Sequence, residues 1–183
     1  SEFIKAAREN GLGGDFTNRR KVEEKFLGIG SPKFEKIQNI KREELEIPKE
    51  WLKVIQKPDG TWKKIIFYNT SVSALLQGGE KMIFKIGNTL KIFEENRNEV
   101  TLLWRPHPLI EPTLTSMRPY LWNAYKKIRD QYIYAKWGIY DASIDMDRAI
   151  VISDAYYGDP SSIVSIYKKT GKPIMIQSVD VIQ

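Results

Sequence analysis

The segment Arg105-Pro106-His107-Pro108 has the residue types best suited to phosphate chemistry. His107 is the single histidine of the chain, and an imidazole can donate a hydrogen bond to a phosphate oxygen or exchange a proton near neutral pH. Arg105 can offer a planar pair of N–H donors to the same phosphate. Prolines on both sides of His107 restrict the local backbone. The structural alternative is a histidine that only packs and an arginine that forms a surface ion pair.

Two further loops combine small polar side chains with a strand-to-helix position. The loop 69–73 would let a phosphate or a sugar approach the backbone, although an ordinary turn would have the same composition. In the loop 158–162, Asp159 is expected to be the N-cap and Pro160 the first residue of a helix, whose free N–H groups favour an anion. Helix capping without a ligand is the alternative. The candidate phosphate-binding residues are Arg105, Asn69, Thr70, Ser71, Asp159, Ser161 and Ser162, with His107 as the catalytic candidate.

Other patterns are interpreted as structural. The glycines in 11–14 and 28–30 fit neither the dinucleotide-binding nor the Walker spacing. Asp141, Asp145 and Asp147 could bind a metal, but with no partner ligand elsewhere they are interpreted as a solvated helix start. We therefore predict no metal site and no cofactor.

Composition limits the class of protein. The 183 residues contain no cysteine, which excludes a disulfide framework and a cysteine-based zinc site. A net charge of +6 favours anionic partners, but basic and acidic residues are interleaved, so no nucleic-acid partner is expected. No apolar run approaches the roughly 20 residues of a membrane helix. We expect a cytoplasmic chain.

Strands are expected to alternate with helices along the chain. The expected strands are 26–30, 64–69, 100–104, 137–140, 155–158 and 173–177; the expected helices are 1–10, 79–96, 115–134, 145–153 and 161–170, with a surface connection over 41–58. This alternation predicts one α/β domain over 1–183, with a Rossmann-like parallel sheet and helices on both faces. Such sheets bind ligands beyond the carboxyl ends of their strands, where the three loops would lie.

Four motifs in order give the chain a family resemblance. They are Gly30-Ser31-Pro32-Lys33-Phe34, then Ile65-Ile66-Phe67-Tyr68-Asn69-Thr70, then Leu103-Trp104-Arg105-Pro106-His107-Pro108, and last Ile152-Ser153-Asp154 leading to Gly158-Asp159-Pro160-Ser161-Ser162 and Gly171-Lys172-Pro173. The chain resembles the CDP-glycerol glycerophosphotransferase family of teichoic-acid and capsule polymerases. It is similar to the C-terminal, donor-binding half of their GT-B catalytic unit.

The resemblance implies a function and a role for each matching residue. His107 matches the histidine at the donor diphosphate, and Asp159, Ser161 and Ser162 match a T-D-Y-S-S motif in which Gly158 and Pro160 replace the threonine and the tyrosine. Asn69 and Val72 depart from the proline and basic residue that often follow the first donor-loop strand. The implied reaction transfers glycerol phosphate from CDP-glycerol to a polymer hydroxyl and releases CMP.

The resemblance also implies partners. The family uses a second histidine from its acceptor-binding half, which this chain lacks, so we expect that half elsewhere in a larger parent protein. The polymer acceptor and a peripheral position at the inner face of the membrane belong to that parent. Two alternatives stay open: a non-catalytic α/β module that binds nucleotides or a protein, and a GT-B enzyme that uses a UDP-sugar.

Overall fold

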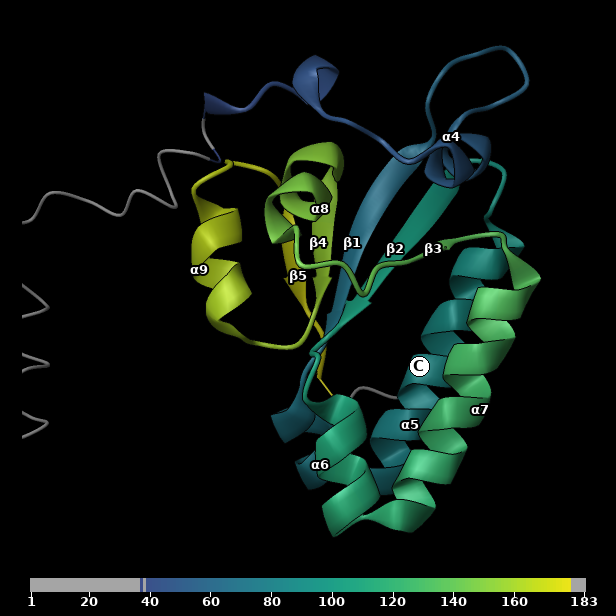
Figure 1. Ribbon diagram of the computed structural model, residues 1–183, viewed down its shortest axis with the longest axis vertical. Helices are drawn as coiled ribbons and strands as arrows, with labels where there is room; N and C mark the ends of the chain where they lie inside the picture. The colour runs from purple at the N-terminus through teal and green to yellow at the C-terminus, as the bar shows by residue number, and fades with distance from the viewer. Residues whose placement is uncertain (1–36, 38, 179–183) are drawn as a thin grey trace, which may run out of the picture. The chain divides into compact units, whose positions relative to one another are not determined.

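A five-stranded parallel sheet organises the part of the chain that the computed structural model describes, Ile37 and residues 39–178 (Figure 1). Its strands are β1 (Lys64–Thr70), β2 (Val100–Pro106), β3 (Ile139–Tyr140), β4 (Ala155–Gly158) and β5 (Ile174–Ile176). They lie in the order β3-β2-β1-β4-β5, and every neighbouring pair is parallel. The prediction of a Rossmann-like parallel sheet is confirmed.

Helices cover both faces of this sheet, as expected. One face carries α5 (Val72–Glu95), α6 (Ile110–Met117) and α7 (Pro119–Ala135), with α5 and α7 side by side (Figure 1). The other face carries α4 (Lys49–Ile55), α8 (Met146–Ile152) and α9 (Ser162–Lys168). A short 3₁₀ helix, η1 (Arg42–Glu44), precedes α4.

Alternate side chains of each strand serve the two faces. Tyr68 of β1 and Trp104 of β2 belong to the core that α5, α6 and α7 cover. Phe67 points to the opposite face, where its ring packs against those of Tyr156 and Tyr167. Because both faces are buried, β1 and β2 each contain a short continuous apolar run rather than alternating polar and apolar residues.

Two helices differ from the expectation. Helix α5 begins at Val72, but it joins two helical segments across Gly79, whose φ of 53° and ψ of −130° are not helical. The start expected at Gly79 coincides with this kink, and the segment before it was not expected. The single helix expected over 115–134 is two helices, α6 and α7, separated at Arg118. Pro119 explains the break, since a proline disfavours helical geometry in the residue before it.

Some expectations fall outside the described residues. These are the helix over 1–10, the strand over 26–30 and the motif at 30–34. The described residues belong to one compact unit, Lys36–Gln183. None of the helices in this described part is long and apolar enough to cross a membrane.

Candidate functional site

The three candidate loops meet at one edge of the sheet. The chain leaves β3 at one end and returns to β4 beside β1, which makes a topological switch point between β1 and β4. The backbone N–H of His107 donates to the Thr70 carbonyl at 2.9 Å, and that of Asp159 donates to the Asn69 carbonyl at 3.0 Å. The Ser161 hydroxyl donates to Asn69 Oδ1 at 3.2 Å. The loops that follow β1, β2 and β4 are therefore tied directly to one another.

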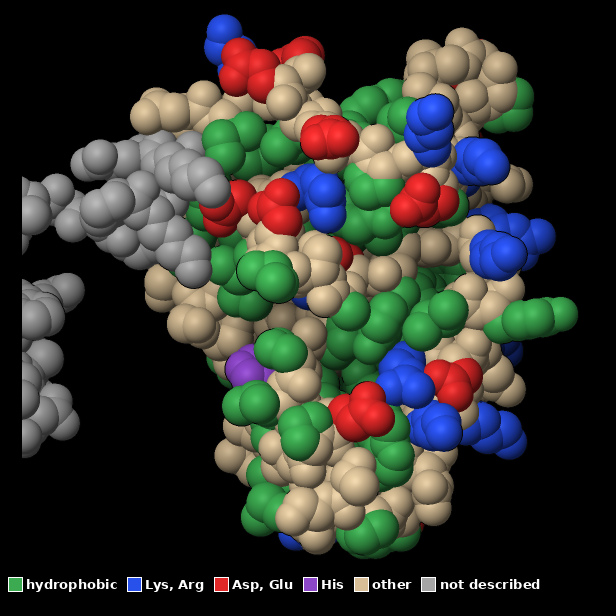
Figure 2. Space-filling view, viewed as in Figure 1, with side chains coloured by type: hydrophobic (Ala, Val, Ile, Leu, Met, Phe, Trp, Pro, Cys, Tyr) green, Lys and Arg blue, Asp and Glu red, His purple; other side chains and the backbone are tan. Residues whose placement is uncertain are grey.

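His107 presents one ring nitrogen to solvent. Its side chain is exposed, and Figure 2 shows the histidine at the surface beside hydrophobic side chains. Nδ1 accepts a hydrogen bond from the Leu109 backbone N–H at 3.1 Å, so the proton of the neutral ring is on Nε2. An Nε2–H group in this position can donate to the oxygen of a bound phosphate.

Arg105 is held by the loop that follows β3. Its guanidinium forms an ion pair with Asp141, whose side chain is 1% exposed, and it donates to the Ser143 carbonyl at 2.6 Å. Asp141 also accepts from the Ser143 backbone N–H at 3.0 Å. An ion pair, one of the two interpretations open from the sequence, is thus present. It fixes the loop after β3 next to His107, and direct contact of Arg105 with a phosphate stays a prediction.

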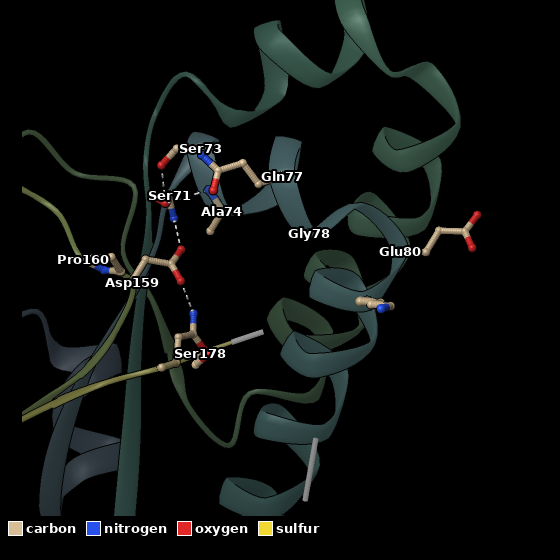
Figure 3. A pocket seen from close by; sticks show the side chains of 11 residues that line it. Ser71, Ser73, Ala74, Gln77, Gly78, Glu80, Asp159, Pro160 and Ser178 are labelled. Carbon is tan, nitrogen blue, oxygen red and sulfur yellow. Dashed lines mark hydrogen bonds between the residues drawn. The ribbon is translucent and has the colours of Figure 1, made fainter. Parts of the chain in front are cut away.

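Asp159 does not cap a helix, which corrects the expectation from its sequence position. Helix α9 begins at Ser162 with Ser161 as its N-cap residue. The Asp159 carboxylate instead accepts from the Ser71 backbone N–H at 2.6 Å and from Gln177 Nε2 at 2.5 Å (Figure 3). It therefore ties the start of α5 to the end of β5. Gln177 carries no sequence signal, because its place beside Asp159 follows only from the strand order.

A polar pocket of about 670 Å³ opens beside this carboxylate. Figure 3 shows Asp159 and Ser71 on one side of it and Ser73 and Gln77, from the first turns of α5, along another. The negative charge of Asp159 is directed at two protein donors rather than into the pocket. Serine hydroxyls, the Gln77 amide and Lys81 line this pocket and can bind an anion or a sugar, and the Glu80 carboxylate also lines it.

A second pocket, of about 210 Å³, lies beyond β2 and β3. Arg105 and His107 line it together with the aromatic rings of Trp122, Tyr125 and Tyr140. The candidate residues therefore line two different pockets, because Ser71 and Asp159 line the polar pocket.

The remaining candidates lie beneath or beside the two pockets. Asn69 and Thr70 are buried, and Ser162 is exposed at the start of α9. Asn69 Nδ2 donates to the Arg105 carbonyl at 2.9 Å, and Thr70 Oγ1 accepts from Trp104 Nε1 at 3.1 Å. Both side chains hold β1 and β2 in place beneath the loops.

The three aspartates that follow β3 do not gather around a metal site. Asp145 is the N-cap of α8 and accepts from the Arg148 backbone N–H at 3.1 Å, which confirms the helix-start interpretation. Asp141 is buried and pairs with Arg105, so the interpretation as a solvated helix start is wrong for this residue. Within the described part of the chain, no group of three or more histidine, cysteine, aspartate or glutamate side chains is placed to hold a metal ion.

Replacing Asp159 by asparagine should change how stability depends on pH. Burial raises the pKa of the Asp159 carboxyl above its ordinary value of 3.8. A raised folded pKa adds stability that is fully present below the unfolded pKa and is lost as the pH rises through the folded pKa. A tenfold change in proton affinity on folding corresponds to about 1.4 kcal/mol of unfolding free energy. The difference in unfolding free energy between the original protein and Asp159→Asn should therefore narrow as the pH rises from about 3 towards neutrality.

Asp59 supplies a control of opposite sign. Hydrogen bonds from Thr61 lower the pKa of the exposed Asp59 carboxyl. The stability that the Asp59 carboxylate contributes is therefore present above the unfolded pKa and is lost in acid. The difference in unfolding free energy between the original protein and Asp59→Asn should widen as the pH rises. Urea unfolding of both variants across this range measures the two trends. If the difference in unfolding free energy between the original protein and Asp159→Asn did not change with pH, burial would not raise the pKa of Asp159.

Comparisons with known proteins give one structural similarity. No protein-family model matches the chain, and no curated protein does. Among solved structures, the chain is similar to the wall teichoic acid polymerase TagF, in a structure described as soaked with CDPG. The TM-score is 0.43 and the sequence identity is 20% over 84% of this chain. The match spans 32% of that protein's chain.

Proposed function

We propose that this chain is the donor-nucleotide-binding domain of an enzyme that resembles CDP-glycerol:polymer glycerophosphotransferases. The observation that carries the proposal is the meeting of three polar loops at the switch point of a parallel sheet, where the His107 amide donates to the Thr70 carbonyl at 2.9 Å. The choice of CDP-glycerol rests on the four motifs of the sequence. The polar pocket of about 670 Å³ supports it, since ligand sites commonly measure roughly 300–1,000 Å³.

The proposed reaction gives His107 a defined role. A hydroxyl of the polymer acceptor attacks the phosphorus that carries glycerol, and a new P–O bond forms. The bond from that phosphorus to the bridging oxygen breaks, and its electron pair leaves with CMP. Negative charge then grows on the departing phosphate. The Nε2–H of His107 would donate to that phosphate and stabilise the charge as it develops.

The other parts of the proposed site prepare the donor for this step. The serine hydroxyls at the start of α5 would bind the diphosphate, and Asp159 would hold that start in place through the Ser71 N–H. The proposal requires an acceptor-binding half with a base to take the hydroxyl proton, and a polymer acceptor at the membrane. It uses no cofactor beyond the donor itself.

A nucleotide panel tests the proposal. We expect CDP and CDP-glycerol to compete for one site on the chain, measured by calorimetry or ligand-observed NMR. We expect ADP to bind at least about tenfold more weakly, a difference of about 1.4 kcal/mol. Equal affinity for CDP, UDP and ADP would remove CDP-glycerol as the donor, and a preference for UDP would favour the UDP-sugar alternative. Salt concentration is the control. Between about 50 and 200 mM salt, the affinity for a nucleic acid would fall far more steeply than the affinity for a single nucleotide.

A further inference from the structure

Gln177 joins two buried groups just after β5. Its Nε2 donates to Asp159 Oδ1 at 2.5 Å, and its Oε1 accepts from the Tyr68 hydroxyl at 3.3 Å. Gln177 is 6% exposed, and Tyr68 is fully buried. An ionised carboxylate only accepts hydrogen bonds, so the amide nitrogen must face Asp159 and the amide oxygen must face the phenol. The network therefore gives the Gln177 amide one orientation.

This contact sets the direction of the Asp159 charge. Oδ2 of the carboxylate accepts from the Ser71 backbone N–H, and Oδ1 accepts from Gln177. Burial raises the pKa of the Asp159 carboxyl, and hydrogen bonds from these two donors lower it. Without Gln177, Oδ1 would be a buried carboxylate oxygen that has lost its donor, which is costly. The carboxylate would regain a partner by turning towards water in the polar pocket, which Asp159 lines.

The charges around the polar pocket make this direction important. Among the described residues that line it, Glu80, Lys81 and Asp159 carry charge. Figure 3 shows the Glu80 side chain extending away from Asp159. Lys81 supplies a positive charge, so an anion in the pocket meets a favourable potential as long as Asp159 points at its two donors. A carboxylate turned into the pocket would offset the charge of Lys81 and repel the anion.

We infer that Gln177 is a positioning residue for anion binding, because its amide keeps the Asp159 carboxylate turned away from the polar pocket. The inference rests on the proposed function, since that function places the donor diphosphate at the serine hydroxyls of this pocket. Gln177 acts through Asp159 and needs no contact with the ligand. Its removal should therefore affect charged ligands and leave uncharged ones unaffected.

The substitution Gln177→Met tests this inference, because methionine is unbranched like glutamine and lacks the N–H donor. At about pH 8, where carboxyls are normally ionised, the affinity for CDP should fall about tenfold, or about 1.4 kcal/mol. The affinity for cytidine, which has no phosphate, should not change. Added salt should reduce the loss for CDP, since salt screens the repulsion. Calorimetry measures both ligands. Gln131→Met is the matched control, since Gln131 is exposed and lines neither pocket.

A second substitution separates the effect of charge from the effect of packing. Adding Asp159→Asn to Gln177→Met should restore most of the lost CDP affinity, because no negative charge remains to turn into the pocket. If Gln177→Met does not fold, Gln177→Glu keeps the shape of the side chain. Two facing carboxylates repel each other, so the CDP affinity of Gln177→Glu should also fall and Asp159→Asn should again restore it.

The outcomes distinguish the inference from the proposed function. Unchanged CDP affinity in Gln177→Met overturns the inference and leaves the proposed function standing. An equal loss for CDP and cytidine also overturns it, as does a loss for CDP that Asp159→Asn does not restore, because Gln177 would then only pack. A chain that binds no CDP even with Gln177 in place overturns both.

Discussion

Replacing His107 by alanine is expected to lower the rate of glycerol phosphate transfer by about 10²- to 10³-fold. In the proposed reaction the Nε2–H donates to a phosphate whose charge grows, so its loss would raise the energy of the transition state more than that of the bound donor. The same substitution should change the unfolding free energy by no more than about 0.5 kcal/mol, because the side chain is exposed. Turnover is measured with the acceptor-binding half that the proposed function requires, and stability by urea unfolding.

The conservative variant His107→Gln separates the two roles a histidine could play. Glutamine keeps an N–H donor but cannot exchange a proton near neutral pH, so partial activity would identify hydrogen-bond donation as the main contribution. The opposite result for His107→Ala would be early melting with full activity in the folded fraction. His107 would then be structural, and the start of α9 at Ser161 and Ser162 would be the remaining candidate for the phosphate site.

The substitution Gly158→Ala should cause the largest loss of stability, about 4 kcal/mol or more. A Cβ at this position would lie 2.2 Å from the Asn69 carbonyl oxygen, and Gly158 has φ 152°. Gly158 pairs with Asn69 across β1 and β4, and the next residue donates its N–H to the same carbonyl at 3.0 Å. An added methyl group would therefore force apart the two strands that carry the candidate loops. Chemical denaturation measures the loss.

Gly171 provides the control for this substitution. It also has a positive φ, of 70°, but a Cβ there would meet no atom within 4 Å. Gly171→Ala should therefore cost only the backbone strain, about 1 kcal/mol. If Gly158→Ala and Gly171→Ala lost similar amounts of unfolding free energy, the close approach of β1 and β4 would not be what requires a glycine at position 158.

The sheet could be predicted from the sequence because its strands are short, apolar and separated by clear helical patterns. The run at 155–158 predicted β4 with its observed bounds, and the runs at 64–69 and 100–104 predicted all but the last residues of β1 and β2. The expected helix start at Gly79 coincides with the non-helical kink of α5. The helical segment over 72–78 was missed because its small polar residues had the composition of a loop. The division between α6 and α7 had a local signal in Pro119 that the periodicity obscured.

The meeting of the loops was predictable, but the partners of their side chains were not. Parallel strands bring their carboxyl ends to one edge, which is enough to place residues 69, 107 and 159 near one another. The roles of Arg105 and Asp159 depend on Asp141 and Gln177, which are distant in the sequence and adjacent only in the fold. The second pocket, which Arg105 and His107 line, also joins rings from α7 and β3 that no local pattern connects.

The two hydrogen bonds of Asp159 make the edge strand and the start of α5 one mechanical unit. One carboxylate oxygen accepts from Ser71 and the other from Gln177, so neither donor can shift far without leaving a buried oxygen unpaired. Among the described residues β5 is an edge strand of the sheet, so a displacement of β5 would be transmitted to the Ser71 loop. A segment that pairs with this edge would stiffen the opposite side of the polar pocket from a distance, without touching anything bound there.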